Sequence, residues 1–197
     1  MTESPGVLDI VSAREGHFLL ESGYHSALWL DLDSLFTEPR RLAPLVRNLA
    51  RGISPYQPSI VCGPLIGGAL LAQLVAGELG IEFSYAQRVS TAETTGLYKT
   101  RYTLPAAYQS RVRRKRVALV DDVMSAGSSL RATCASLQDL GAIPVVVGAL
   151  MVLGSKGENF FRERSIPVEA GERREYLVWE PSHCPLCASG IALEKTA

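Results

Sequence analysis

The sequence predicts an α/β fold with a mainly parallel central sheet flanked by helices. Strand-like and helix-like stretches alternate from residue 59 to residue 153, which is typical of parallel strands joined by helices that cover both faces of a sheet. The stretches 117–120 and 144–153 are apolar at nearly every position, as expected of strands buried on both faces. Polar or glycine-rich turns follow the strands at Gly63 and Asp121. Because carboxyl ends of parallel strands share one edge, a site is expected there.

The N-terminal third should form a small layer ahead of this core. Thr37 is a good helix N-cap and Pro39 fits a first helical turn. The helix that they begin should continue to about Arg51, because apolar residues recur on one of its faces. In order, the expected elements are a short helix over 7–15, strands over 18–20 and 27–32 around a turn at Ser22-Gly23, and this helix.

The core elements follow from apolar runs and from the residues that end them. Glycine favours helix ends, since it adopts left-handed backbone conformations freely. Residues 89–107 lack clear periodicity and are long enough for a functional loop. The expected elements are strand 59–62, helix 67–79 ending at Gly80, strand 82–87, strand 116–120, helix 128–140 ending at Gly141, strand 144–153, a short helix 160–164 and a last strand 176–179.

Composition narrows the functional classes. The 197 residues are 47% hydrophobic and 20% charged, with 20 basic and 20 acidic side chains, a balance that argues against bulk nucleic-acid binding. No apolar run reaches a membrane-span length, and the first residues lack the features of a signal peptide, so we expect no membrane partner and a cytoplasmic location. The four cysteines do not suggest a disulfide framework in such a chain.

Residues 117–129 carry the most informative pattern. A buried strand ends in two adjacent carboxylates, Asp121 and Asp122, and a small, hydroxyl-rich turn from Ser125 to Ser129 opens an amphipathic helix. The unpaired amides and the dipole of a helix N-terminus favour a phosphate. Carboxylates beside it can accept hydrogen bonds from sugar hydroxyls. The pattern therefore predicts a sugar-phosphate ligand.

This segment resembles the type I phosphoribosyltransferases, which bind 5-phosphoribosyl-1-pyrophosphate (PRPP). Their motif is an apolar strand, Asp-Asp or Glu-Asp, two apolar residues and Thr/Ser-x-Gly-Thr/Ser, and residues 117–128 match every position. The resemblance implies a type I phosphoribosyltransferase fold with an N-terminal hood, Mg²⁺ bound with PRPP, and a homodimer. It also implies catalytic roles for Asp121, Asp122 and Arg88, and a 5-phosphate site at Ser125, Ala126, Gly127, Ser128 and Ser129.

A second turn, residues 63–68, also joins a strand to a helix. It lacks the Lys-Ser/Thr of a P-loop, so that kind of nucleoside-triphosphate site is not expected. Its small residues let the backbone approach an anion closely, although a tight packing turn would look the same. In the family, the corresponding turn offers amides to pyrophosphate, which implies this role for Leu65, Ile66, Gly67 and Gly68.

Residues 18–31 are similar to the opening of orotate phosphoribosyltransferases, with Ser22, Gly23, Ser26 and Asp31 at matching positions. In that family this segment forms a hood over the acceptor base. The resemblance spans residues 7–150. It makes four hood residues candidates for the base site: Glu21, Tyr24, His25 and Trp29.

Two departures put orotate itself in doubt as the acceptor. Many orotate enzymes carry lysine where Glu21 stands, and a fixed carboxylate would repel the orotate carboxylate. The family's loop lysines and histidine are also missing after Arg88, where Val89 and Ala92 stand instead. Losing such preorganised charge costs about 3 kcal/mol of transition-state stabilisation. Lys99 and Arg101 lie downstream. They either supply the missing positive charges or are ordinary solvent-exposed residues of the loop.

Cys184 and Cys187, in His183-Cys-Pro-Leu-Cys187, form half of a zinc-knuckle pattern. Two thiolates at this spacing can occupy one edge of a tetrahedral metal site. Only His183 lies close in sequence, so the remaining ligands could come from a second subunit. The alternative is a pair of reduced thiols in a tail.

Together these observations predict a hood at 1–37, a PRPP-binding α/β core at 38–155 and a C-terminal extension at 156–197. The predicted activity is pentosyl transfer from PRPP to a nitrogenous base with pyrophosphate release, in nucleotide metabolism and specifically pyrimidine biosynthesis. Two other classes stay open. The missing loop lysines favour a non-catalytic PRPP- or nucleotide-binding regulator, and the cysteine pair favours a metal-bearing adapter.

Overall fold

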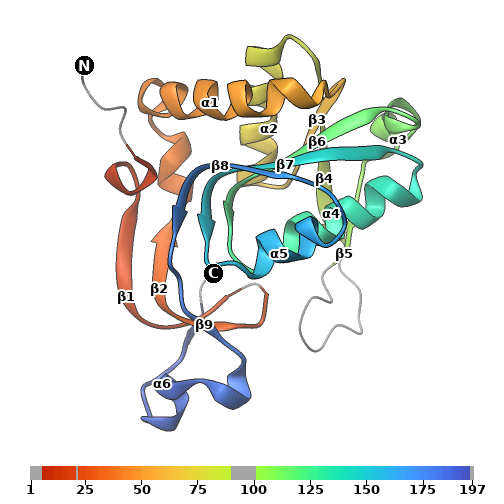
Figure 1. Ribbon diagram of the computed structural model, residues 1–197. Coiled ribbons are helices and arrows are strands. Elements are labelled where there is room, and N and C mark those ends of the chain that lie inside the picture. Colours follow the sequence, from red (N-terminus) through yellow and green to blue (C-terminus); the bar gives the residue numbers. More distant parts are fainter. Residues whose placement is uncertain (1–5, 21, 90–100, 196–197) are drawn as a thin grey trace.

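A six-stranded, mainly parallel sheet forms the centre of the computed structural model, which describes residues 6–20, 22–89 and 101–195 (Figure 1). The strand order is β5-β4-β3-β6-β7-β8, and all neighbours are parallel except the β4–β5 pair. The α/β prediction is therefore confirmed. The strands are β3 (Ile60–Pro64), β4 (Glu82–Val89), β5 (Arg101–Thr103), β6 (Arg116–Met124), β7 (Ile143–Leu153) and β8 (Val168–Arg174).

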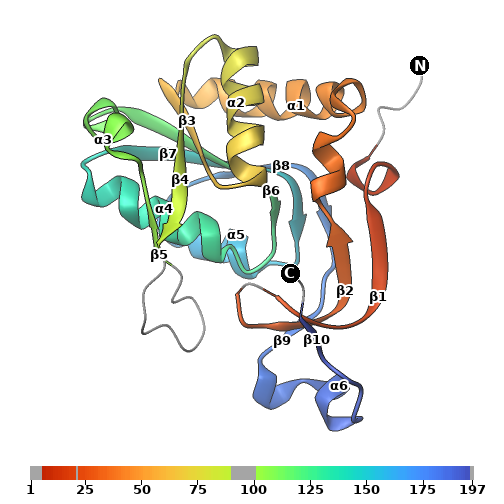
Figure 2. The same cartoon turned by 180° about the vertical axis from the view of Figure 1, so that it is seen from behind.

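Helices cover both faces of this sheet, as Figures 1 and 2 show. Alternate residues of β6 explain the two cores: Ala118 and Val120 pack on the α1/α2 side, whereas Val117 and Leu119 pack on the α3/α4/α5 side. Both faces must be apolar in a strand buried in this way. The helices are α1 (Pro39–Ile53), α2 (Gly67–Leu79), α3 (Ala106–Val112), α4 (Ser128–Asp139) and α5 (Lys156–Arg162). Among the described residues, none of the helices is long and apolar enough to cross a membrane.

A second sheet, the hood sheet, lies at the carboxyl edge of the central one. Its order is β10-β1-β2-β9, so that strands from both ends of the chain share it. The β1–β2 hairpin is antiparallel, β10 runs parallel to β1, and β9 runs antiparallel to β2. Its strands are β1 (Ser12–Leu19), β2 (His25–Asp31), β9 (Val178–Trp179) and β10 (Glu194–Lys195), with the short helix α6 (Pro185–Ala188) between the last two.

The final segment does not form a separate layer. Its strand β8 extends the central sheet beside β7, and β9 and β10 complete the hood sheet. The described part of this segment, residues 156–195, therefore contributes strands to both sheets. The sequence did not reveal β8, because an edge strand reading Val-Glu-Ala-Gly-Glu-Arg-Arg is half charged.

Two local predictions were wrong. Residues 7–15 form only a 3₁₀ turn over Val7–Asp9, and β1 begins at Ser12. The first half of β1 is exposed, so pairing with β2 and β10, rather than local propensity, defines it as a strand. The expected loop 89–107 contains β5 and the start of α3, whereas residues 90–100 lie outside the described residues.

Candidate active site

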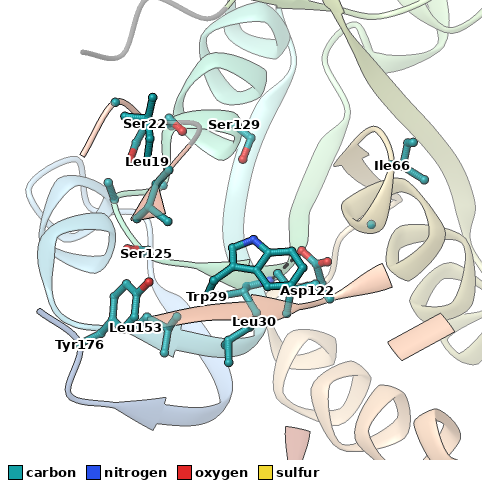
Figure 3. A pocket seen from close by; sticks show the side chains of 18 of the residues that line it. Leu19, Ser22, Trp29, Leu30, Ile66, Asp122, Ser125, Ser129, Leu153 and Tyr176 are labelled. Atoms are coloured by element: carbon teal, nitrogen blue, oxygen red, sulfur yellow. Dashed lines mark hydrogen bonds between the residues drawn. The ribbon is translucent and has the colours of Figure 1, made fainter. Parts of the chain in front are cut away.

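One large cavity of about 850 Å³ lies where the hood sheet meets the carboxyl ends of β3, β4 and β6. The central sheet contributes its polar wall, from Asp122 to Ser129, and the hood contributes a mainly apolar wall that includes Trp29. Figure 3 shows Trp29 and Asp122 in the same cavity, with Ser125 and Ser129 around it. The edge at which the strand pattern predicted a site is therefore hollow.

The turn between β6 and α4 has the geometry of an anion site. Gly127 adopts a left-handed conformation, with φ of 73°, and α4 begins at the next residue. All five residues of the turn line the cavity. The first amides of a helix have no intrahelical partner, and the helix dipole adds positive potential at this end. Residues 125–129 thus present a helix N-terminus to the cavity.

The hydroxyl of Ser125 is a second indication of a polar ligand. Within the part of the chain that the structure describes, its buried Oγ has no hydrogen-bond partner. A buried, unsatisfied hydroxyl costs free energy unless a ligand or water completes its hydrogen bonds. Because Ser125 also lines the cavity, a phosphate oxygen there would satisfy it.

The two carboxylates at the end of β6 have different environments. Asp122 lies on the cavity wall, whereas Asp121 is 6% exposed and does not line the cavity. Ser129 Oγ donates to Oδ2 of Asp121 at 3.0 Å. Burial, and secondarily the charge of Asp122, raise the pKa of Asp121 well above its ordinary value. Asp122 therefore faces the cavity, whereas Asp121 lies behind the wall and is hydrogen-bonded to the turn through Ser129.

The turn after β3 lies against these carboxylates. A Cβ on Gly67 would come within 2.3 Å of Oδ2 of Asp122, so only glycine allows this close approach. Leu65, Ile66 and Gly67 line the cavity and Gly68 is buried behind them. The Leu65 amide donates to the Ala86 carbonyl at 2.8 Å, which corrects the expectation that it is offered to pyrophosphate.

Of the cationic residues predicted to lie at the site, only some are described by the structure, and these differ in whether they line the cavity. Arg88, at the end of β4, lines the cavity beside Tyr102 of β5. Arg101 is exposed in β5, opposite Val89, and is not among the lining residues. Lys99 lies outside the described residues. Of the three, Arg88 is the one that the described structure places at the site.

The four hood residues predicted to contact the base also differ in their position relative to the cavity. Trp29 lines the cavity, and Glu21 lies outside the described residues. Tyr24 is buried beneath Lys156, whose Nζ lies 3.9 Å from the ring centroid. His25 is buried against His17, with 3.0 Å between their nearest ring nitrogens. Neither Tyr24 nor His25 is part of the cavity wall, so the expectation that they contact the base is corrected.

Sequence reasoning missed several lining residues, among them Leu153, Tyr176 and Lys195 from the later part of the chain. The Tyr176 hydroxyl donates to the Leu28 carbonyl at 2.6 Å, which connects the final segment to β2. Lys195 is placed by the pairing of β10 with β1. Nothing local in the sequence signals either residue, because long-range strand pairing brings each of them to the cavity.

Comparison with known proteins agrees with this geometry. A phosphoribosyl transferase domain model matches residues 33–170. The orotate phosphoribosyltransferase of Caldanaerobacter subterraneus subsp. tengcongensis is 32% identical over 197 residues, covering 98% of this chain and 96% of the relative. That of Thermotoga maritima is 30% identical over 184 residues, covering 92% and 89%.

Solved structures with the same fold include two base-specific enzymes. Orotate phosphoribosyltransferase from Aeropyrum pernix gives a TM-score of 0.63 at 20% identity, over 84% of this chain and 88% of that chain. Adenine phosphoribosyltransferase from Thermoanaerobacter pseudethanolicus gives 0.66 at 15% identity, over 84% and 96%. At these identities the similarity establishes the fold.

A type I phosphoribosyltransferase fold with a large cavity at the carboxyl edge of its central sheet defines the class of this protein. The chain belongs to the phosphoribosyltransferase family and is a PRPP-dependent pentosyltransferase that resembles the orotate phosphoribosyltransferases. The fold and the reaction class predicted from the sequence are both confirmed.

The Asp121→Asn variant is expected to be more stable than the parent at pH 8. A raised pKa in the folded state means that protonated Asp121 stabilises the fold fully below its unfolded value of 3.8, and that this contribution is lost as pH rises through the folded-state pKa. Asparagine is never charged, so the variant should gain about 1 kcal/mol, or about 2–4 °C in Tm, at pH 8.

The gain should be smaller at pH 5, because a raised pKa means that lowering the pH reduces the cost of the buried charge in the parent. Thermal unfolding at both pH values measures it. Asp139→Asn, the same change at the exposed end of α4, is the control. An equal gain at both pH values would show that the ionisation of Asp121 is not the cause.

Proposed function

We propose that this protein transfers the 5-phosphoribosyl group of PRPP to a ring nitrogen of a planar base, in the cavity between the central and hood sheets. The α4 N-terminus and the Ser125 hydroxyl would bind the 5-phosphate. Asp122 would accept hydrogen bonds from the ribose hydroxyls. The acceptor would lie against the apolar hood wall, where Trp29 offers a flat surface.

One observation carries this proposal most directly. Ser125, whose buried hydroxyl has no partner among the described residues, and the first turn of α4 line the same cavity as Asp122. Anion donors beside a carboxylate acceptor suit a ligand that carries both a phosphate and hydroxyl groups. A site for inorganic phosphate alone would not need the carboxylate.

The proposed transfer places charge where Asp122 can stabilise it. As the bond from the anomeric carbon to pyrophosphate breaks, positive charge develops on the ribose ring, as in glycoside hydrolysis. A fixed carboxylate on the cavity wall stabilises that charge without reorganisation. Arg88, on the same wall, would attract the departing pyrophosphate.

Magnesium fits this arrangement. Asp122 and the oxygens of PRPP are the hard ligands that Mg²⁺ prefers, usually with several waters retained. When bound, the ion would neutralise charge on the pyrophosphate. We propose Mg²⁺ with PRPP, and a homodimer in which Arg88 lies near the subunit boundary. Light scattering coupled to gel filtration tests the dimer.

We also propose a cytoplasmic location. None of the four cysteines forms a disulfide and three of them are buried, which suits a reducing compartment.

Pyrophosphate release tests the enzyme proposal. The protein is incubated with PRPP, Mg²⁺ and, separately, orotate, uracil, adenine, hypoxanthine and guanine. Base-dependent release with formation of the matching nucleotide is expected for one of them. Tight PRPP binding without release for any base would instead favour the regulatory alternative, which the exposed Val89 at a position of expected positive charge also favours.

Orotate is expected to be a poor acceptor, at least tenfold below the best base in kcat/KM. The reason is that the negative charge of the Glu21 carboxylate would repel the carboxylate of orotate. Glu21→Lys should raise orotate turnover about tenfold, and Glu15→Lys, at an exposed position of β1, is the matched control. Efficient orotate turnover by the parent would reject this specificity argument and leave the transferase proposal intact.

A further inference from the structure

We propose that His17, His25, Cys184 and Cys187 bind one zinc ion that fastens the hood to the C-terminal segment. The two histidines come from β1 and β2, and the two cysteines flank the start of α6. One potential ligand atom from each side chain lies within 4.8 Å of all the others. The site is separate from the cavity, whose wall contains none of the four residues.

The distances between these atoms match the edges of a zinc tetrahedron. His17 Nε2 lies 3.0 Å from His25 Nδ1 and 3.4 Å from Cys184 Sγ. Cys187 Sγ lies 3.7 Å from His17 Nε2 and 3.3 Å from His25 Nδ1. Usual zinc–nitrogen and zinc–sulfur bond lengths give edges of about 3.3 Å between nitrogens and about 3.6 Å between nitrogen and sulfur. Small adjustments would centre an ion.

A hydrogen bond outside the cluster fixes the orientation of His17. Its Nδ1 lies 2.8 Å from the Ile191 carbonyl, and because a carbonyl can only accept, Nδ1 must carry the hydrogen. Nε2 of a neutral ring is then a lone pair, aimed at the other three atoms. The lone pair on His17 Nε2 can accept only one good hydrogen bond, so hydrogen bonding alone does not explain why three other ligand atoms lie around it. A metal ion would bind all four atoms at once. Such an outer hydrogen bond is a usual feature of metal-binding histidines.

The donor set selects the metal. Two thiolates and two imidazoles without a carboxylate favour zinc over magnesium or calcium. Four protein ligands complete a tetrahedron and leave no open position, which is typical of a structural site. His17, His25 and Cys184 are buried, so water has little access to their ligand atoms and competes weakly with them for the metal ion.

This set corrects the sequence-based idea of His183 or a second subunit as the source of the missing ligands. The His183 side chain is 80% exposed and its Nδ1 lies 3.8 Å from Glu180. The described residues of a single chain supply all four ligands. His17 and Cys184 are 167 residues apart in the sequence, which is why spacing alone did not suggest the pairing.

The ion would shape the cavity from outside. Figures 1 and 2 place α6 on the far side of the hood strands from the central sheet. Leu19 follows His17 in β1, and Trp29 shares β2 with His25, and both line the cavity. Tyr176 and Lys195, on either side of the cysteine pair in sequence, line it as well. An ion that holds the four ligands would therefore fix the positions of β1 and β2, and of the chain segments before and after the cysteine pair that carry Tyr176 and Lys195.

Metal analysis of the full-length protein tests this proposal without reference to catalysis. The parent, purified without chelator, should contain about one zinc per chain. Cys184→Ser and His17→Gln should contain at least tenfold less zinc. His183→Ala, beside the cysteines, and Cys134→Ser, a buried cysteine in α4, are matched controls and should keep the parent content.

Cobalt provides a second readout that does not depend on a folded variant. Stoichiometric Co²⁺ added to metal-free parent should produce thiolate-to-cobalt charge transfer and the intense visible bands of a tetrahedral complex, and Zn²⁺ should abolish both. A parent without bound zinc and without these bands would overturn the proposal, as would equal zinc loss in the control variants. Neither result bears on pyrophosphate release, so the transferase proposal is tested separately.

Discussion

Replacement of Asp122 by asparagine is expected to lower kcat/KM for PRPP about a thousandfold, equivalent to about 4 kcal/mol of transition-state stabilisation. Asp122 is the carboxylate of the pair that lies on the cavity wall. Asparagine keeps its shape and can still accept a hydrogen bond, but it removes the negative charge that is proposed to face the ribose ring. Steady-state measurement of pyrophosphate release with the preferred base gives the effect.

Binding of ribose 5-phosphate distinguishes this role from general damage to the site. The phosphate is proposed to bind at residues 125–129, so Asp122→Asn should change its Kd by about threefold or less. Asp139→Asn makes the same chemical change at an exposed residue of α4 and should leave both quantities unchanged. If Asp122→Asn kept kcat/KM within tenfold of the parent, electrostatic stabilisation by this carboxylate would be rejected.

The turn at residues 125–129 was predictable because its determinants are local. Apolar residues at 117–120 define a doubly buried strand, and small hydroxyl residues after Met124 define a helix start. Strand, turn and helix follow one another without a long-range contact, and the structure has them as β6 and α4. Helix α2 was placed with equal accuracy, from Gly67 to Leu79, because Gly80 ends it with φ of 66°.

The hood was predictable only in part because its determinants are not local. Its β1–β2 hairpin was predicted from two short strand-like stretches around the turn at Ser22-Gly23, but the strands that complete the sheet come from the other end of the chain. His17 sits in a strand that local periodicity did not reveal, so its approach to Cys184 could not be inferred. The Leu65 amide is a similar case: a hydrogen bond to Ala86 of the neighbouring strand engages it.

Gly127→Val is expected to weaken binding of ribose 5-phosphate about thirtyfold, or about 2 kcal/mol. Gly127 has φ of 73° and precedes the first residue of α4. A β-branched residue strongly disfavours this conformation, and a Cβ would already lie 3.4 Å from Gly157 Cα. The turn must therefore change its backbone angles, and its amides would no longer converge on one phosphate. Isothermal titration measures the loss.

Gly80→Val separates loss of the phosphate site from loss of stability. Gly80 has a similar φ of 66°, and an added Cβ there meets nothing within 4 Å. The control therefore imposes a comparable backbone cost at the end of α2, away from the cavity wall. Both variants should lower Tm, but only Gly127→Val should raise the Kd. Equal affinities in the two variants would mean that the 5-phosphate does not bind at the N-terminus of α4, and the site would have to be sought elsewhere.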